Sequence, residues 1–151
     1  MRLVVTAVRE NGRSYVASDA DIPDAGLIWD ADPRDTQKWI DAIDPSKALG
    51  MAQPKPGGLK WMLVKLPPGA GMAKADHGLD GMDEDGFHVT RTIDYIYVID
   101  AGAVLRLDEG EVVLGSGNVV LQQATRHAWR NPCDHPVQFI AVLVSGETST
   151  A

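Results

Sequence analysis

Residues 86–102, GFHVTRTIDYIYVIDAG, decide the fold of this chain. Successive side chains of an extended strand point to opposite faces, so every second residue shares a side. One side of this segment begins with four polar residues, namely His88, Thr90, Thr92 and Asp94. The same side continues with Ile96 and Val98. A wall that passes from polar to apolar along its length is expected in a barrel with a polar mouth and a packed floor.

Short apolar segments follow one another along most of the chain and are separated by turn residues. Strands are expected over residues 59–66, 95–99, 103–107, 111–114, 119–122, 127–130 and 137–144. The turns between them carry Asp108-Glu109-Gly110, Gly115-Ser116-Gly117 and Asn131-Pro132. Many short strands with glycine-containing turns and no helix between them indicate an antiparallel sandwich or barrel. The expected fold class is therefore all-β.

The N-terminal part has a different character. Apolar residues at 4–8 and 15–16 bracket Asn11-Gly12, a dipeptide that favours a tight hairpin turn. Asp, Pro and Gly then dominate an arm to about residue 58, in which Thr36 could cap a short helix that ends near Ile43.

We expect three regions along the chain. A hairpin and arm over residues 1–58 packs on a barrel over residues 59–145, and residues 146–151 form a disordered tail. The two tryptophans of the arm, Trp29 and Trp39, need burial. The arm could therefore act instead as a lid, or as a strap exchanged in a dimer.

The composition restricts the class of partner. With 151 residues the chain fits one domain. Its formal net charge of −7 argues against nucleic acid, since binding to a phosphate backbone depends on Lys and Arg. No run of about 18 apolar residues is found, so we expect a cytoplasmic protein that makes no contact with a membrane.

The single cysteine, Cys133, lies in a turn between two expected strands. It excludes an intramolecular disulfide and a multi-cysteine metal cluster within the chain. A catalytic thiolate is not expected, because His135 is its only basic neighbour in the turn.

A second polar strand lies in residues 115–131, GSGNVVLQQATRHAWRN, which supply Gln122, Thr125 and His127, with Trp129 on the side of His127. This segment and residues 86–102 together resemble the two signature motifs of the cupin superfamily, small double-stranded β-helix barrels of the jelly-roll kind. The motifs have the forms G-x5-H-x-H-x3–4-E-x6-G and G-x5-P-x-G-x2-H-x3-N. The resemblance covers about residues 59–145 and implies a cupin jelly-roll barrel.

The resemblance gives each polar residue a position in the motifs. His88 falls on the first ligand histidine and His127 on the last one, while Asn131 falls on the asparagine. Thr90 replaces the second histidine, and a hydroxyl is a poorer ligand than imidazole for first-row metals. Asp94 replaces the glutamate, so its carboxylate reaches one methylene less far.

Other positions also depart from the motifs. Ala101 and Ala124 stand where the motifs carry glycine, and Gln122 stands where the second motif carries proline. Asn118 takes a place often held by aspartate in relatives. The chain looks most like a subgroup of single-domain cupins with the patterns H-x-T-x3-DY and VVQ-x-G-T-x-HAWRN, from which no common reaction follows.

Three functions remain open for these residues. In the first, His88, Asp94 and His127 bind one divalent metal, Fe, Mn, Ni or Zn, in a metal-dependent oxygenase. In the second no metal is bound, and Asp94 fixes the imidazole of His127 and raises its proton affinity, with His88 as a third catalytic group. In the third the barrel only binds a small ligand. The acidic loop upstream could supply a missing metal ligand from His77, Asp80, Asp83, Glu84 or Asp85, although a solvated loop is expected.

The metal-free hypothesis suits isomerisation, dehydration, cyclisation or decarboxylation of a small carbonyl compound, because these reactions need proton transfer more than redox chemistry. The residues expected to contact the substrate are Thr90, Thr92, Gln122 and Trp129. Lyase or isomerase chemistry on a small organic molecule is our working hypothesis.

Tyr95 and Tyr97 lie on the opposite face of the strand from Asp94, because successive side chains alternate, so they are expected to point away from the pocket. We expect a homodimer, because edge strands and the arm tryptophans need covering.

Overall fold

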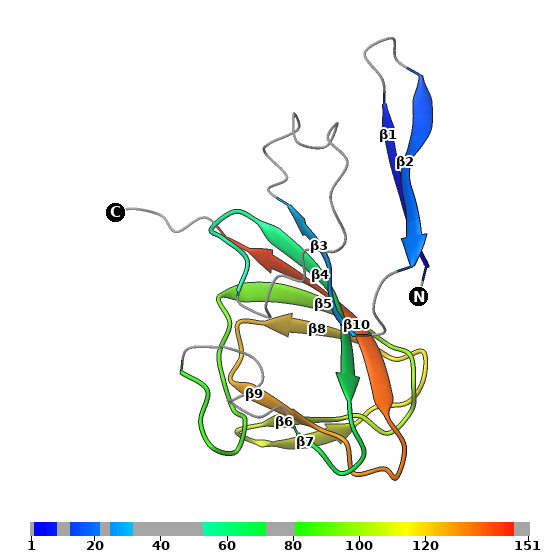
Figure 1. Ribbon diagram of the computed structural model, residues 1–151. Helices are drawn as coiled ribbons and strands as arrows, with labels where there is room; N and C mark the ends of the chain where they lie inside the picture. The colour runs from blue at the N-terminus through cyan, green and yellow to red at the C-terminus, as the bar shows by residue number, and fades with distance from the viewer. Residues whose placement is uncertain (1, 9–12, 22–24, 32–52, 72–80, 147–151) are drawn as a thin grey trace, which may run out of the picture.

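The computed structural model describes residues 2–8, 13–21, 25–31, 53–71 and 81–146 (Figure 1). Within these residues every helix or strand assigned is a β-strand, which confirms the all-β prediction. The strands are β1 (Arg2–Val8), β2 (Ser14–Asp21), β3 (Gly26–Ala31), β4 (Leu59–Leu66), β5 (Thr92–Val98), β6 (Val104–Leu107), β7 (Gly110–Val113), β8 (Val119–Gln123), β9 (His127–Arg130) and β10 (Val137–Ser145). Nowhere in the described part is there a helix long and apolar enough to cross a membrane.

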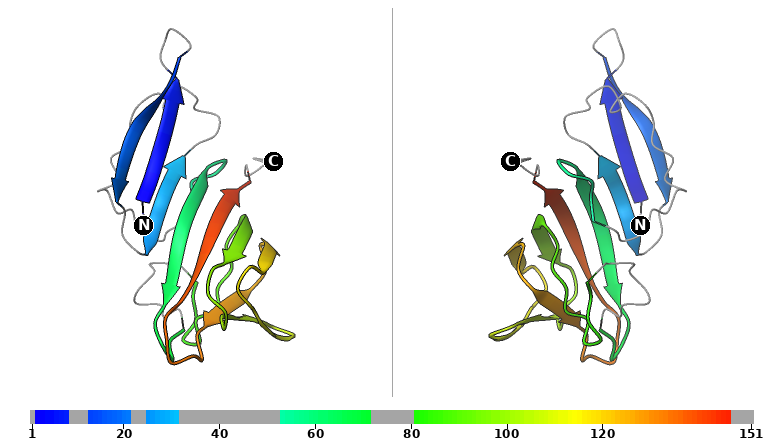
Figure 2. Two further views of the ribbon diagram at one scale, coloured as in Figure 1. Left: turned by 90° about the vertical axis from the view of Figure 1, so that its right-hand side faces the viewer. Right: turned by 90° about the vertical axis from the view of Figure 1, so that its left-hand side faces the viewer.

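Two antiparallel sheets form the barrel and lie face to face (Figure 2). One sheet has the strand order β3-β4-β10-β5-β8 and the other has the order β7-β6-β9. Two isolated antiparallel bridges, Gly71 with Arg130 and His88 with His127, also pair residues outside the strands with β9. Neighbouring strands such as β10 and β4 are far apart in sequence, so the chain crosses repeatedly between the sheets. This strand order is that of a jelly roll.

The core lies between the two sheets. Alternate residues of β10 are buried, among them Phe139, Ala141 and Leu143. The ring of Phe139 stacks on Trp129 of β9, with centroids 4.4 Å apart, and so joins one sheet to the other. Burial of one such side chain contributes about 1.5–3 kcal/mol to stability. The buried face of β5 passes from Asp94 to Ile96 along the strand, as the alternation predicted.

The N-terminal hairpin is formed by β1 and β2, which pair antiparallel with Val8 opposite Ser14. Its predicted turn at Asn11-Gly12 lies outside the described residues. The helix predicted from Thr36 to Ile43 and the tail after residue 146 also lie outside them. The region boundaries at residues 58 and 145 therefore stay predictions.

The arm contains a strand that the sequence pattern did not predict. Strand β3 pairs antiparallel with β4 and forms the edge of the larger sheet. The pairing shifts at a β-bulge between Leu27 and Trp29. A bulge interrupts the alternation of side chains, and this strand of six residues is flanked by Asp, Pro and Gly, so its pattern resembled a loop.

Candidate active site

The two histidines of the candidate site face each other across a single antiparallel bridge. The N–H of His88 donates to the carbonyl of His127 over 2.9 Å, and the N–H of His127 donates back over 3.0 Å. The two imidazole centroids lie 4.3 Å apart, with the ring planes tilted by 56°. Both side chains are buried. The structure therefore brings together two imidazoles from segments that are far apart in the sequence.

Each imidazole is oriented by the carbonyl group two residues before it. His88 Nδ1 lies 3.0 Å from the carbonyl oxygen of Gly86, and His127 Nδ1 lies 2.9 Å from that of Thr125. A carbonyl oxygen can only accept, so in each neutral ring Nδ1 carries the proton and Nε2 keeps a lone pair. The pair therefore provides two basic nitrogen atoms.

Asp94 is connected to His127 through Gln122. The Nε2 amide group of Gln122 donates to Asp94 Oδ2 over 2.8 Å and lies 3.1 Å from His127 Nε2. Both of these atoms accept, so the NH₂ group of the amide must face them and its Oε1 atom must face away. Asp94 Oδ1 accepts a 2.5 Å hydrogen bond from the hydroxyl of Thr92. The four side chains form one hydrogen-bonded chain that ends at the imidazole.

This chain corrects the direct contact between Asp94 and His127 that the sequence led us to expect. The pairing of β5 with β8 places Gln122 opposite Asp94, so the amide lies between the carboxylate and the imidazole. Burial lowers the pKa of His127 from 6.5 to about 4, and His88 adds to this effect. The predicted rise in proton affinity of His127 is therefore wrong. Burial also raises the pKa of Asp94, against the hydrogen bonds that its carboxylate accepts.

Five polar residues, His88, Thr90, Asp94, Gln122 and His127, line a cavity of about 50 Å³. Its remaining walls are mostly apolar and include Met62, Val64, Ile96, Trp129, Phe139 and Leu143. Thr90 and Gln122 line the cavity as predicted residues of the substrate site, whereas Thr92 does not, because its hydroxyl bonds Asp94. Among the described residues, Thr90 Oγ1 and Gln122 Oε1 are buried without a hydrogen-bond partner. Buried polar atoms normally have one, so these two atoms mark a place for a ligand or for water.

The two segments that carry the predicted motifs thus meet at one bridge of a jelly roll, with their buried side chains around the cavity. The chain has the cupin fold. The position of His88 beside His127 agrees with the alignment of both residues to the histidines of the two cupin motifs. No protein-family model matches the sequence.

Two curated fungal proteins are similar to part of this chain. Phomopsin biosynthesis cluster protein C' of Diaporthe leptostromiformis is 39% identical over 69 residues, which are 45% of this chain and 35% of the relative. Phomopsin biosynthesis cluster protein D of the same organism is 36% identical over 77 residues, which are 50% of this chain and 34% of the relative. The matched part of the chain spans about a third of the length of these relatives.

Several solved structures of cupin proteins are similar to part of the chain. A cupin domain from Bordetella pertussis Tohama I is 20% identical, with 58% of this chain and 82% of that chain covered and a TM-score of 0.45. An RmlC-like cupin family protein with a double-stranded β-helix fold from Methanocaldococcus jannaschii is 17% identical, with 58% and 70% covered and a TM-score of 0.46. These likenesses concern the fold alone.

The donor atoms of this cupin pocket do not fit the metal site predicted from His88, Asp94 and His127. Both oxygens of Asp94 accept hydrogen bonds, and the NH₂ group of Gln122 faces the Nε2 lone pair of His127. A metal ion on His127 would need the Nε2 lone pair that faces this amide, whereas each oxygen of Asp94 keeps a second lone pair. In the described part of the chain, no three His, Cys, Asp or Glu side chains are arranged to hold an ion. Residues 77 and 80, considered as additional ligands, lie outside that part.

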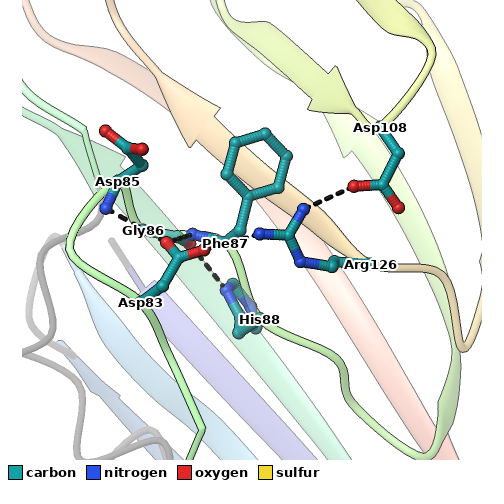
Figure 3. A network of polar contacts seen from close by, with 7 residues as sticks. All are labelled: Asp83, Asp85, Gly86, Phe87, His88, Asp108 and Arg126. Atoms are coloured by element: carbon teal, nitrogen blue, oxygen red, sulfur yellow. Dashed lines mark hydrogen bonds and ion pairs between the residues drawn. The ribbon is translucent and has the colours of Figure 1, made fainter.

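Arg126, which precedes His127 in this cupin barrel, was not predicted as part of the site. Its guanidinium bonds Asp83 over 2.6 Å, also bonds Asp108, and lies 4.3 Å from the centre of the Phe87 ring (Figure 3). We call these four residues, Asp83, Phe87, Asp108 and Arg126, the Arg126 clamp. They come from three separate turns, so no spacing in the sequence connects them. The acidic loop was expected to be solvated, but the carboxylate of Asp83 forms an ion pair with Arg126.

The Arg126 clamp holds the turn that orients His88. Asp83 Oδ1 accepts the backbone N–H of Phe87 over 2.8 Å and that of Asp85 over 3.0 Å. This folds the loop back at Gly86, which has a φ of 82°. The carbonyl of Gly86 is the group that fixes Nδ1 of His88 (Figure 3). The clamp is therefore connected to the imidazole by one short piece of backbone.

The two alanines at glycine positions of the cupin motifs differ in their backbone. Ala124 has a φ of 50° and is the single non-glycine residue with a positive φ in the described part of the chain. Ala101 has no positive φ, but the next residue, Gly102, has a φ of 108°. A Cβ atom on Gly102 would lie 2.3 Å from Sγ of Cys133. Glycine is thus needed one residue later than the first motif places it.

Asn131, at the asparagine of the second cupin motif, has a structural role. Its side chain is buried, and its Nδ2 group donates to the carbonyls of Leu66, Pro67 and His135 over 3.0, 3.1 and 2.7 Å. Its Oδ1 atom accepts the backbone N–H of Cys133 over 2.9 Å. These bonds join the turn after β9 to the end of β4.

Proposed function

We propose that this cupin barrel is a lyase or isomerase that moves a proton on a small organic molecule. The observation that supports this is the buried pair of imidazoles, 4.3 Å apart, in which each Nε2 atom keeps its lone pair. A general base must be unprotonated when it meets its substrate. Burial lowers the pKa of His127 to about 4, so that ring stays neutral near pH 7 and its Nε2 lone pair faces the amide of Gln122.

We assign the role of general base to His88 on the geometry of the hydrogen bonds. Nε2 of His127 already faces the amide of Gln122, whereas Nδ1 of His88 is fixed by backbone and its Nε2 is the acceptor atom. His127 then serves as a positioning residue, because it keeps the amide of Gln122 in one orientation.

The reaction starts at a carbon next to a carbonyl group. His88 takes a proton from that carbon, and the electron pair moves to the carbonyl oxygen to give an enolate. The hydroxyl of Thr90, which lines the same cavity, would donate to this oxygen. If the carbon that lost the proton carries a hydroxyl, that hydroxyl passes its proton to the enolate oxygen, and return of the abstracted proton from His88 to the former carbonyl carbon completes an isomerisation. If instead a group on the β-carbon, on the other side of the deprotonated carbon, departs with its electron pair, the carbonyl group re-forms and an elimination is complete. Neither route needs an oxidant.

The curated relatives support a role in small-molecule chemistry, since both are named for a biosynthesis cluster. A barrel that binds a ligand without turnover would have the same cavity, so the experiment must separate these two functions.

The test uses hydroxyacetone as a probe in deuterated water. We expect the protein to exchange the hydrogens next to the carbonyl for deuterium faster than buffer alone, as measured by proton NMR. The H88Q variant should lose this exchange, and R130Q, which removes only the exposed ion pair with Glu111, should keep it. Saturable binding of hydroxyacetone without exchange above buffer would instead identify a ligand-binding protein.

A further inference from the structure

The polar wall of the cavity accepts more hydrogen bonds than it donates. Gln122 Oε1 can only accept, and the Nε2 atom of neutral His88 is likewise an acceptor. The hydroxyl of Thr90 can both donate and accept. Thr90 and Gln122 are 3% and 4% exposed, and their Oγ1 and Oε1 atoms have no partner among the described residues. A molecule in the cavity that supplies a hydrogen to Gln122 therefore removes the cost of an unpaired buried acceptor.

The orientation of this acceptor is imposed by its surroundings. The NH₂ end of Gln122 faces two acceptors, Asp94 Oδ2 and His127 Nε2, so an amide flip would place three acceptors together. Oε1 thus remains turned away from both. Because the amide is fixed, Oε1 of Gln122 faces the cavity as an acceptor that needs a donated hydrogen, and this does not change when a ligand enters.

The cavity has no positive charge to offer an anion. No Lys or Arg is among the described residues that line it, and its one charged side chain is the carboxylate of Asp94. A carboxylate or phosphate group would thus be buried beside a like charge. A cation is also disfavoured, because Asp94 already accepts hydrogen bonds from Thr92 and Gln122 and would not replace the lost hydration.

The size of the cavity limits the ligand further. A volume of about 50 Å³ exceeds what one water molecule needs, and we expect it to favour a compact ligand. The other lining residues are apolar, with Met62, Trp129 and Leu143 among them. Such a wall favours a short hydrocarbon end on the ligand.

We propose that the ligand of this pocket is a compact, uncharged hydroxycarbonyl compound that donates a hydroxyl hydrogen to Gln122 Oε1 and accepts the Thr90 hydroxyl at its carbonyl oxygen. That the ligand has a carbonyl group rests on the proposed proton-transfer function. That it is uncharged and donates a hydroxyl hydrogen rests on the unpaired Oε1 of Gln122 and on the charges of the residues that line the cavity.

Binding is measured separately from turnover to test this class. Four probes of similar size are titrated against ¹⁵N-labelled protein: hydroxyacetone, butanone, glycolate and propylammonium. We expect saturable shifts of the amide signals of His88 and His127 with hydroxyacetone, and binding at least about tenfold weaker for butanone, which lacks the donor hydrogen. Equal or tighter binding of butanone, glycolate or propylammonium would overturn the assignment.

Two isosteric variants provide the matched controls. T90V removes a hydroxyl that meets no hydrogen-bond criterion among the described residues, so it should lower thermal stability less than T92V does while weakening the binding of hydroxyacetone about tenfold. T92V removes the hydroxyl that bonds Asp94, so it should lower stability. Unchanged affinity in T90V would contradict the proposed contact. Selective binding of hydroxyacetone without deuterium exchange would leave the ligand class standing and remove the catalytic function.

Discussion

Ala124 adopts a backbone conformation that suits glycine better than alanine, with a φ of 50°. The left-handed region costs an L-residue about 1–2 kcal/mol, and the greater freedom of glycine in the unfolded chain offsets part of that difference. We therefore expect A124G to raise the free energy of unfolding by about 0.5–1 kcal/mol in urea titrations. A101G is the control, because Ala101 lacks a positive φ and should gain nothing. Stabilisation by A101G but not by A124G would contradict the conclusion that the positive φ of Ala124 favours glycine at that position.

His127 should make the stability of the protein depend on pH. Its pKa is lowered from 6.5 to about 4 by burial, so the unfolded chain binds the proton more tightly. The stabilising contribution is complete above pH 6.5 and is lost as the pH falls through 4, by up to about 3 kcal/mol. Asp94 acts in the opposite sense, because its raised pKa stabilises the folded state as it becomes protonated.

The H127Q variant isolates this contribution from that of Asp94. Urea titrations of both proteins at about pH 7 and about pH 4.5 should show a smaller loss of stability in H127Q than in the parent protein. An equal loss in the two proteins would mean that His127 is already able to take up a proton in the folded state.

At the scale of elements, the Arg126 clamp should matter more for activity than for stability. Exposed ion pairs contribute little to the free energy of folding. We expect R126Q to shift the melting temperature only slightly but to lower the rate of deuterium exchange several-fold, because the turn that holds the Gly86 carbonyl against His88 is released. R130Q removes an ion pair of similar exposure outside the clamp and serves as control. Equal rates in R126Q and R130Q would contradict this role.

The turn between β5 and β6 should tolerate no side chain at Gly102. Its φ of 108° is unfavourable for alanine, and a Cβ atom would lie 2.3 Å from Sγ of Cys133. We expect G102A to lower the free energy of unfolding by about 2–4 kcal/mol. The double variant G102A/C133A should recover the part due to the clash and retain the part due to the backbone, as thermal and urea denaturation can measure. Full recovery would show that the backbone is not strained.

The strands were predictable where alternation and turn residues agree. The predicted strand at 137–144 matches β10 closely, and its alternate burial shows why, since one face packs against the opposite sheet. Strand β5 begins at Thr92 rather than at the predicted Tyr95, because buried polar residues do not look like a strand when only apolar ones are counted. Strand β3 was missed because its bulge breaks the alternation.

The residues of the site were predictable, but their connections were not. Alternation placed His88 and Asp94 on the inner face, and resemblance to two motifs suggested that His127 would join them. The amide of Gln122 between Asp94 and His127 depends on the register of β5 against β8, which are separated by two other strands in sequence. The same is true of the Arg126 clamp, whose members meet only in the folded chain.

For the whole molecule, the orientation of Gln122 predicts weak affinity for divalent metals. Protein purified without added metal should contain far less than one equivalent of Fe, Mn, Ni or Zn by elemental analysis. The Q122E variant replaces an N–H donor beside Asp94 and His127 by a carboxylate, so it should gain affinity for Zn²⁺ or Mn²⁺ in calorimetric titrations. A stoichiometric metal in the parent protein would show that the amide moves aside to admit it.

The outer face of the larger sheet exposes a row of apolar side chains on β5 and β8, namely Ile93, Tyr95, Tyr97, Val119 and Leu121. The two tyrosines point away from the cavity, as alternation predicted. Contiguous apolar surface often marks an association site, and the expected homodimer stays a prediction. Light scattering should show a dimer that Y97E converts to a monomer, while R91E, beside this row, should leave it intact. A monomeric parent protein would contradict the expectation.

Each imidazole of the site takes its direction from a carbonyl only two residues upstream on its own stretch of backbone. Neither of these two hydrogen bonds involves the apolar side chains that line the cavity. An engineer could therefore shorten Met62 or Leu143 to admit bulkier compounds and still retain two nitrogens presented in their basic form, which makes this barrel a suitable starting scaffold for new acid–base catalysts.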